Sequence, residues 1–143
     1  MASGDNTLKL IEKLSDALSY LLELKKRGQY QKGIELIDDT LANYLEFDSS
    51  ETNILSEKFI EEVSNNSGKL THDIVNSIGD LLNEKGELLY NQNRLKESKE
   101  ILKNALTIYF FLNDQQDIFS FERMNKMVLI NNKLSKIDLQ IES

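Results

Sequence analysis

Apolar residues recur every three or four positions along almost the whole chain, the spacing of one face of an amphipathic helix. Polar stretches interrupt this pattern at short intervals, which predicts six helices with short connections and an all-α fold class. We expect the first helix to begin with Asn6 or Thr7 as its N-cap. The helices that follow are expected over about residues 29–47, 51–65, 71–92, 94–112 and 117–139.

Apolar side chains that share a helix face are the candidate core positions. The main core candidates are Leu8, Leu14, Leu21 and Leu22 in the first helix, Ile78, Leu81, Leu82, Leu88 and Leu89 in the fourth, and Phe121, Met124, Val128, Ile130, Leu134 and Ile137 in the last.

The chain contains an internal repeat with an offset of 65 residues. Gly28 and Asn93 occupy the two corresponding turns, and both residue types tolerate a positive φ. Small residues recur early in the second helix of each pair, at Gly33 and Ser98, where we expect the helices to approach closely. Identical residues at this offset are Leu24 and Leu89, Glu35 and Glu100, Leu41 and Leu106, and Tyr44 and Tyr109.

Gly79 lies inside the fourth predicted helix, and the apolar pattern passes through it without a change of phase. A single interior glycine costs only about 1 kcal/mol, so we favour a continuous helix. The alternative is a break at Gly79, which would give three repeats. With a continuous helix and one helix over 51–65, the two hairpins are expected to run in opposite directions and form a compact bundle.

The segment 79–112 resembles the tetratricopeptide repeat (TPR) family, in which each repeat is a pair of antiparallel helices. A weaker copy covers residues 14–47, so the resemblance extends over about half of the chain, and the NRLKESKEILKNALTIYFFLND stretch also resembles small uncharacterised TPR-like bacterial proteins. The positions that match the family pattern are Gly86 on its glycine, Leu82 on its tryptophan, Leu89 on its tyrosine and Ala105-Leu106 on its Ala-Leu pair. Three positions depart from the pattern: Lys85 replaces a leucine, Asn93 a glycine and Phe110 a proline.

The resemblance implies a non-enzymatic protein–protein interaction or scaffold domain, with its binding groove on the first helix of the hairpin. The partner-binding residues it implies are Asn83, Glu87, Tyr90 and Asn91. Because Asp80 and Glu84 lie among them, the expected partner is a basic or neutral protein or peptide. The alternative is a small-molecule or metal-binding helical bundle with a weak enzymatic role. A homodimer through the sixth helix is a further possibility.

The net charge of −7 is concentrated in one part of the chain. Between Gly33 and Gly68 nine acidic residues stand against Lys58 alone. Such a charge disfavours binding to nucleic acid or to an anionic membrane. The acidic segment is either a solvated surface or a docking patch for a basic partner.

Residues that could carry chemistry are scarce. The chain has no cysteine, and His72, its only histidine, is expected in the first turn of a helix. We therefore expect no catalytic residue, no metal site and no cofactor. No apolar stretch reaches membrane-spanning length and no secretory signal is present, so a cytoplasmic protein is expected. The expected organisation is a flexible N-terminus over 1–6, a single helical domain over 7–139 and a tail over 140–143.

Five aromatic residues lie close together near the last turn: Tyr109, Phe110, Phe111, Phe119 and Phe121. Three consecutive rings cover most of a helix circumference, so at least one must leave the buried face. We expect the five rings to form one cluster that holds the sixth helix against the fifth. The alternative is a partly exposed apolar groove for a peptide or for self-association.

Overall fold

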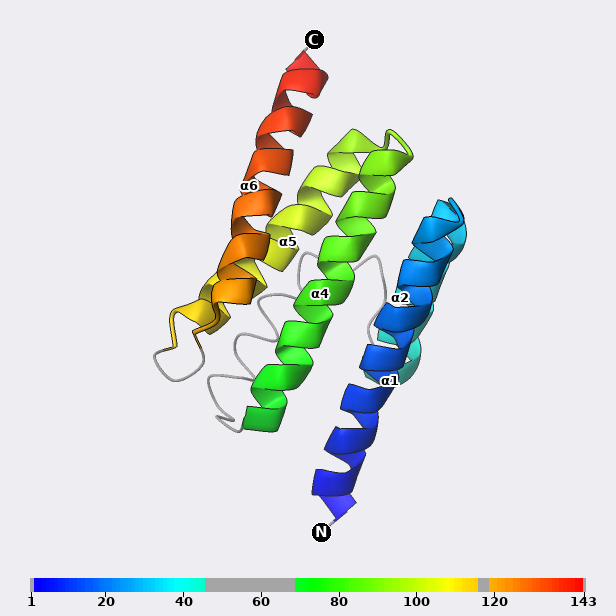
Figure 1. The fold of residues 1–143 in the computed structure, drawn as a ribbon, viewed down its shortest axis with the longest axis vertical. Helices are drawn as coiled ribbons and strands as arrows, with labels where there is room; N and C mark the ends of the chain where they lie inside the picture. The colour runs from blue at the N-terminus through cyan, green and yellow to red at the C-terminus, as the bar shows by residue number, and fades with distance from the viewer. Residues whose placement is uncertain (1, 46–68, 116–118, 143) are drawn as a thin grey trace.

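The computed structural model describes residues 2–45, 69–115 and 119–142, and these ranges contain α-helices and no strand. The protein is therefore all-α, as predicted (Figure 1). The predicted helix over 51–65 lies outside the described residues. The helices are α1 (Ala2–Lys26), α2 (Tyr30–Leu45), α4 (Lys69–Asn91), α5 (Leu95–Asn113) and α6 (Phe121–Glu142).

The two inter-helix turns have the same backbone geometry. Gly28 has a φ of 72° and Asn93 a φ of 61°, so both adopt the left-handed conformation that the sequence predicts. In each turn the amide that follows this residue donates to a carbonyl in the last turn of the preceding helix, which is the Schellman pattern. The two bonds are Gln29 N to Leu24 O and Arg94 N to Leu89 O, each 2.9 Å.

Helix α4 is continuous through Gly79, which confirms that prediction. A Cβ at position 79 would lie 2.9 Å from Cε1 of Tyr109. Glycine is therefore required here by the close approach of α5 and does not mark a break in the helix. The α4·α5 hairpin is the most extensive helix pair among the described elements.

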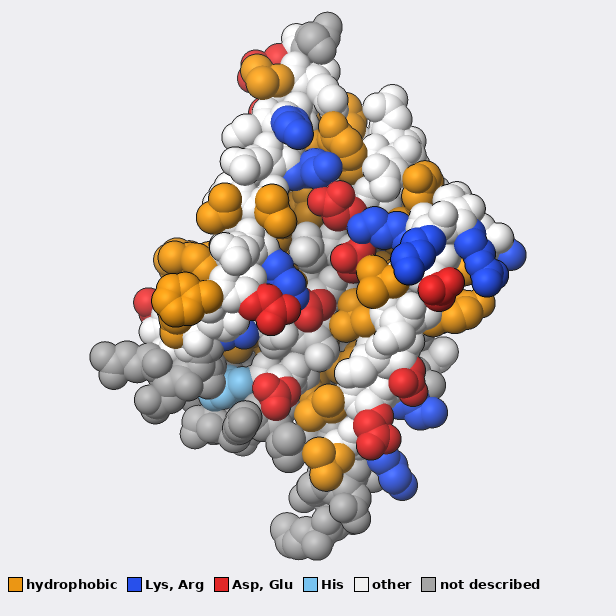
Figure 2. All heavy atoms as spheres, viewed as in Figure 1, with side chains coloured by type: hydrophobic (Ala, Val, Ile, Leu, Met, Phe, Trp, Pro, Cys, Tyr) orange, Lys and Arg blue, Asp and Glu red, His pale blue; other side chains and the backbone are white. Residues whose placement is uncertain are grey.

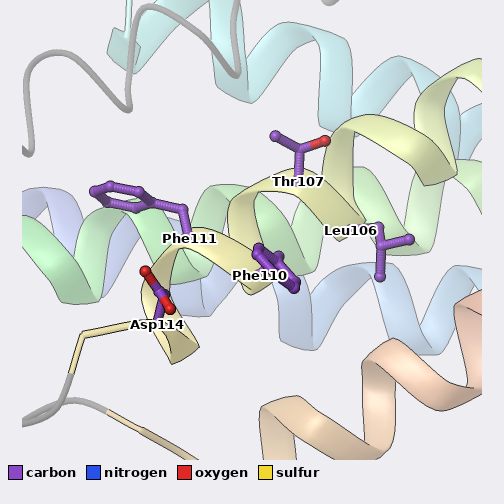
Figure 3. A pocket seen from close by; sticks show the side chains of 5 residues that line it. All are labelled: Leu106, Thr107, Phe110, Phe111 and Asp114. Atoms are coloured by element: carbon purple, nitrogen blue, oxygen red, sulfur yellow. The ribbon is translucent and has the colours of Figure 1, made fainter.

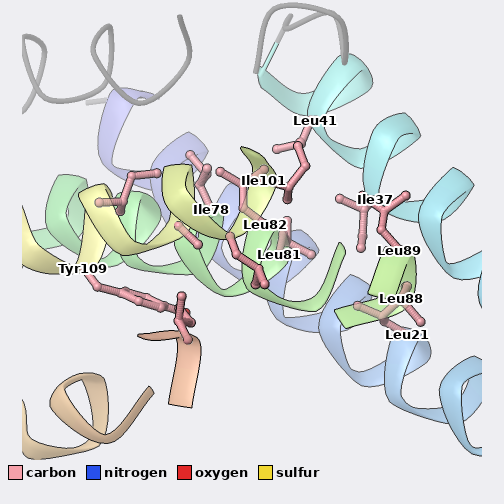
Figure 4. Close-up of a cluster of buried hydrophobic side chains, with 14 of the residues drawn as sticks. Leu21, Ile37, Leu41, Ile78, Leu81, Leu82, Leu88, Leu89, Ile101 and Tyr109 are labelled. Carbon is pink, nitrogen blue, oxygen red and sulfur yellow. The ribbon is translucent and has the colours of Figure 1, made fainter. Parts of the chain in front are cut away.

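Helix α4 is the centre of the fold because it packs against α1, α2 and α5. Its regular apolar face is fully buried, in agreement with the sequence pattern. Figure 4 shows side chains from the surrounding helices converging on it. The labelled core residues are Leu21, Ile37, Leu41, Ile78, Leu81, Leu82, Leu88, Leu89, Ile101 and Tyr109.

Helices α1 and α4 run parallel. Leu18 of α1 lines the same hollow as Asp80 of α4, and further along both helices the ammonium of Lys25 lies 3.2 Å from the carboxylate of Glu84. Residue numbers therefore increase in the same direction along α1 and α4, as the ribbon also shows (Figure 1).

Helix α2 runs antiparallel to α4. Gln31, near the start of α2, accepts a hydrogen bond from Gln92, just past the end of α4. Asp38, later in α2, pairs with Lys85, earlier in α4. The carboxyl end of α2 and the amino end of α4 consequently lie at the same end of the molecule (Figure 1).

The two hairpins, α1·α2 and α4·α5, therefore run in the same direction, and the expectation of opposed hairpins is wrong. That expectation assumed a single helix over 51–65 between the two hairpins, which would reverse the direction of the second hairpin. In the structure the end of α2 and the start of α4 lie at the same end of the molecule, so α1 and α4 point in the same direction.

In α1 and α6, the helix limits and the set of buried residues differ from the prediction. Helix α1 begins at Ala2, upstream of the expected N-cap, and α6 is shifted to later residues than expected. Ile130 and Ile137 of α6 are buried, as predicted, and Leu134 packs against the core. The predicted core residues that the structure places at the surface are Leu8, Leu22, Phe121, Met124 and Val128.

The five aromatic rings do not form one buried cluster. Tyr109 is fully buried, whereas Phe110, Phe119 and Phe121 are exposed. Phe119 and Phe121 contact each other edge to face, with ring centroids 5.1 Å apart. The prediction of a single cluster is wrong because the three consecutive rings of α5 point in different directions: Tyr109 is fully buried, Phe111 is partly buried against the core and Phe110 is exposed.

Candidate functional site

A hollow of about 200 Å³ lies over α4, between α1 and α6. Figure 2 shows this side of the molecule, with charged side chains gathered between the two flanking helices. We call the surface of α4 between α1 and α6 the α4 groove. The residues that line the hollow are Leu18, Leu22, Asp80, Asn83, Glu84 and Lys126.

The polar side of the α4 groove follows from helical spacing. Asp80, Asn83, Glu84, Glu87 and Tyr90 are three or four positions apart, so they share one face of α4. All five are partly buried, whereas the leucines between them are fully buried on the opposite face. One helix therefore provides both the core of the fold and the floor of the groove.

Each acidic residue on this face forms an ion pair with a lysine from a flanking helix. The lysines come from α1 on one side and from α6 on the other. Since each negative charge is matched, the groove is close to neutral, in contrast with the acidic surface that the sequence of α4 alone indicates. The pairs are Glu84 with Lys25 at 3.2 Å, Asp80 with Lys126 at 2.9 Å, and Glu87 with Lys133 at 3.4 Å.

Asp80 is the most extensively bonded of these acids. It accepts hydrogen bonds from the buried hydroxyl of Tyr109 and from the Asn76 amide, in addition to the ammonium of Lys126. Burial, and then the negative charge of Asp80, raise the pKa of the Tyr109 phenol far above its ordinary value. Tyr109 is therefore a neutral hydrogen-bond donor, and its role at this site is to hold the Asp80 carboxylate in place.

Arg123 connects the start of α6 to the rest of the fold. Its guanidinium donates to Asn76 Oδ1 at 2.7 Å and to Asn113 Oδ1 at 2.8 Å. Desolvation lowers the pKa of Arg123 from its usual range, and the nearby Asp80 charge partly opposes this. These bonds fix α6 beside α4, which places Lys126 and Lys133 over the groove.

Three of the four residues that the TPR resemblance implies as partner-binding lie on the α4 groove. Asn83 lines the hollow. Glu87 pairs with Lys133, and the Lys133 ammonium also lies 4.1 Å from the centre of the Tyr90 ring. The Tyr90 hydroxyl accepts a hydrogen bond from Gln140 of α6. Asn91 is exposed at the last position of α4, beyond the hollow.

Sequence reasoning missed the contributions of α1 and α6 to the groove. Lys25 lies 59 positions from Glu84, and Lys126 lies 46 positions from Asp80. No local pattern connects residues so far apart. The available signal was the repeat itself, because two hairpins in the same direction bring their first helices side by side.

A second hollow, of about 470 Å³, lies against α5 and is lined by Leu106, Thr107, Phe110, Phe111 and Asp114 (Figure 3). It is apolar and lies on a different helix from the α4 groove. No cluster of three or more His, Asp or Glu side chains that could hold a metal ion occurs within 2–45, 69–115 and 119–142. In the same ranges, no helix combines the length and the apolar character needed to cross a bilayer.

Comparisons with known proteins give no relative. No protein-family model matches the chain, and neither the curated proteins nor the solved structures contain a match. The functional interpretation therefore rests on the geometry of the α4 groove.

Proposed function

We propose that the protein is a non-enzymatic protein–protein interaction domain of TPR-like type, which binds a segment of its partner in the α4 groove. The observation that carries this proposal is the parallel arrangement of α1 and α4, with α6 on the other side of α4. In a stacked array of helical hairpins the first helices line one common surface. Here α1 and α4 are those first helices, and α6 takes the corresponding place after the second hairpin.

The hairpin packing supports the TPR-like part of the proposal. The Ser98 hydroxyl donates to the carbonyl of Gly86 at 2.7 Å, which requires small residues on both helices. In the first hairpin a Cβ at Gly33 would lie 3.0 Å from Leu21, so the second helix again approaches closely at a small residue. Together with the matching turns, these contacts support the interpretation of the two hairpins as repeats of one unit.

The chemistry of the groove favours a neutral partner segment with an apolar side chain. The acids of α4 are already paired with lysines, so a basic segment would have to displace those lysines. Leu22 is half exposed at the edge of the hollow, and Leu18 lies beside it. The hollow of about 200 Å³ is smaller than the roughly 300–1,000 Å³ typical of small-molecule sites, which favours insertion of one side chain over a small ligand.

A substitution of Leu22 tests the proposal. We expect Leu22→Asp to weaken binding of peptides selected from a random display library by about tenfold or more, because it places a carboxylate where the apolar side chain would dock. The measurement is fluorescence anisotropy with labelled peptides that the wild-type protein selects.

Tyr20→Asp is the matched control. Tyr20 is 59% exposed and Leu22 is 50% exposed on the same helix, but only Leu22 lines the hollow. The control is expected to retain wild-type affinity and both variants wild-type helicity. Equal affinity of both variants for the peptides would contradict the assignment of the groove.

A further inference from the structure

Helix α6 contributes little to the hydrophobic core. Of the 19 residues in the buried core cluster, only Ile130 and Ile137 come from α6. Helix α5, which is shorter, buries eight residues. Among the described helices α6 packs extensively only against α5, and it lies at one edge of the fold (Figure 1). The core formed by α1, α2, α4 and α5 is therefore nearly complete without it.

Polar side chains join α6 to α4. Lys126 pairs with Asp80 and Lys133 with Glu87, and the side chains of these two pairs are 19–31% exposed. The bonds that Arg123 makes to two asparagines are likewise polar. Ion pairs that water can reach contribute little to stability, because solvation competes with the attraction. Contact with α4 therefore adds little to the hold that the two isoleucines provide.

Helix α6 is a poor helix by itself. Isolated helices of about this length are marginal in water, and their stability in proteins comes mainly from packing. The helix also contains three asparagines, whose helix propensity is low: Asn125, Asn131 and Asn132. Undocking and unfolding of α6 are therefore one event, and α6 forms a cooperative unit that is less stable than the rest of the fold.

The inward contacts of α6 repeat every seven residues. Lys126 and Lys133 are seven positions apart, and so are their two partners on α4. Each lysine is followed four positions later by a buried isoleucine, Ile130 or Ile137. One side of α6 thus presents a cation and an apolar side chain in each of two consecutive heptads, which matches the acids of α4 and the core beside them.

Loss of α6 changes the charge of the α4 groove. Asp80 and Glu87 lose their cations, whereas Glu84 keeps Lys25 of α1. The Tyr109 hydroxyl still holds the Asp80 carboxylate in place, because Tyr109 belongs to α5. The groove is close to neutral with α6 in place and becomes acidic without it, so the open groove attracts a basic segment.

We propose that α6 is a displaceable wall of the α4 groove, which unfolds while α1, α2, α4 and α5 stay folded, and that a basic amphipathic helix of the partner takes its place. The partner helix has the pattern of α6, with a cation every seven residues and an apolar residue four positions after each cation. The displacement rests on the proposed binding role of the groove, whereas the opening of α6 is a property of the chain alone.

Hydrogen–deuterium exchange of the full chain, measured by mass spectrometry, tests the opening. We expect amides of α6 to exchange at least about tenfold faster than those of α4, because they exchange through a partial opening. Combining Lys126→Gln with Lys133→Gln is expected to speed exchange in α6 by a further factor of about three or more, with little change in α2.

Lys136→Gln is the matched control for the exchange experiment. This lysine is exposed on the same helix and has no ion pair among the described residues, so wild-type exchange is expected. Equal exchange in α6 and α4 of the wild type would overturn the opening. An α6 that exchanges no faster in the double lysine variant would overturn the role of the ion pairs.

Binding of a synthetic peptide with the sequence of residues 119–142 tests the displacement. Ile130→Asp places a carboxylate in the core and is expected to hold α6 open. The full-length variant is then expected to bind the peptide at least about tenfold more tightly than the wild type, in which the chain's own α6 competes at high effective concentration. A peptide that carries Lys126→Gln and Lys133→Gln is expected to bind about tenfold more weakly.

Val128→Asp is the control for the opened variant, because Val128 is 53% exposed on the same helix and its substitution leaves α6 docked. An Ile130→Asp protein that loses protection in α4 would show that α6 is not a separate unit. One that stays protected in α4 and yet binds the peptide no better than the wild type would overturn the displacement. If the groove binds nothing at all, the Leu22→Asp and peptide assays fail together while exchange in α6 remains fast.

Discussion

Asp38→Ala is expected to lower the free energy of unfolding by about 3 kcal/mol, because it leaves the ammonium of Lys85 without its partner in the interior. The two groups lie 2.7 Å apart, between α2 and α4. The side chain of Lys85 is 9% exposed and that of Asp38 is 29% exposed, so water offers little compensation to the lysine once the carboxylate is gone. The measurement is urea denaturation followed by circular dichroism.

Two further variants separate this mechanism from a general effect of losing an acid. Asp39→Ala removes the neighbouring carboxylate, which is exposed, and is expected to change stability by less than about 0.5 kcal/mol. Combining Asp38→Ala with Lys85→Leu removes both charges and is expected to recover most of the loss. A double variant as unstable as Asp38→Ala would show that the unpaired lysine is not the cause.

Gly86→Val is expected to destabilise the protein by about 3 kcal/mol through overpacking of the α4·α5 contact. A Cβ at this position would lie 2.5 Å from Cγ of Leu102, which is too close for either helix to accommodate without a shift. Leu102 is fully buried and cannot move outward. Thermal and urea unfolding of the variant measure the effect.

Leu102→Ala tests whether the loss comes from a steric clash with Leu102. Alone it is expected to cost about 3 kcal/mol through the cavity it leaves. In combination with Gly86→Val the new side chain occupies that space, so the double variant is expected to be at least about 1 kcal/mol more stable than the sum of the two losses predicts. Strict additivity would contradict a direct contact between the two positions.

The sequence predicts well those features that depend on local spacing. The left-handed turns at Gly28 and Asn93, the continuous helix through Gly79 and the buried face of α4 are all confirmed. Each of them depends on backbone conformation or periodicity within a few turns of helix. The buried side of α6 was less predictable. Apolar residues occur on two sides of this helix, and only its packing against α5 decides which side is buried.

The features that the sequence could not predict are those that join distant parts of the chain. Lys85 stands where the TPR pattern has a leucine, and its partner Asp38 lies 47 positions away. In the sequence Asp38 belongs to an acidic segment, and nothing local marks it as half of a buried pair. The ion pairs across the α4 groove and the direction of the two hairpins were hidden for the same reason.

The parallel arrangement of α1, α4 and α6 is the basis of the proposed groove, and zero-length carbodiimide coupling tests it directly. This reagent joins carboxylates to ammonium groups that are in contact, and mass spectrometry identifies the linked peptides. Working at low protein concentration restricts the links to those within one chain. The expected links are Lys25 to Glu84, Lys126 to Asp80 and Lys133 to Glu87. Coupling of Lys25 to Asp73, near the opposite end of α4, without a link to Glu84, would contradict the arrangement.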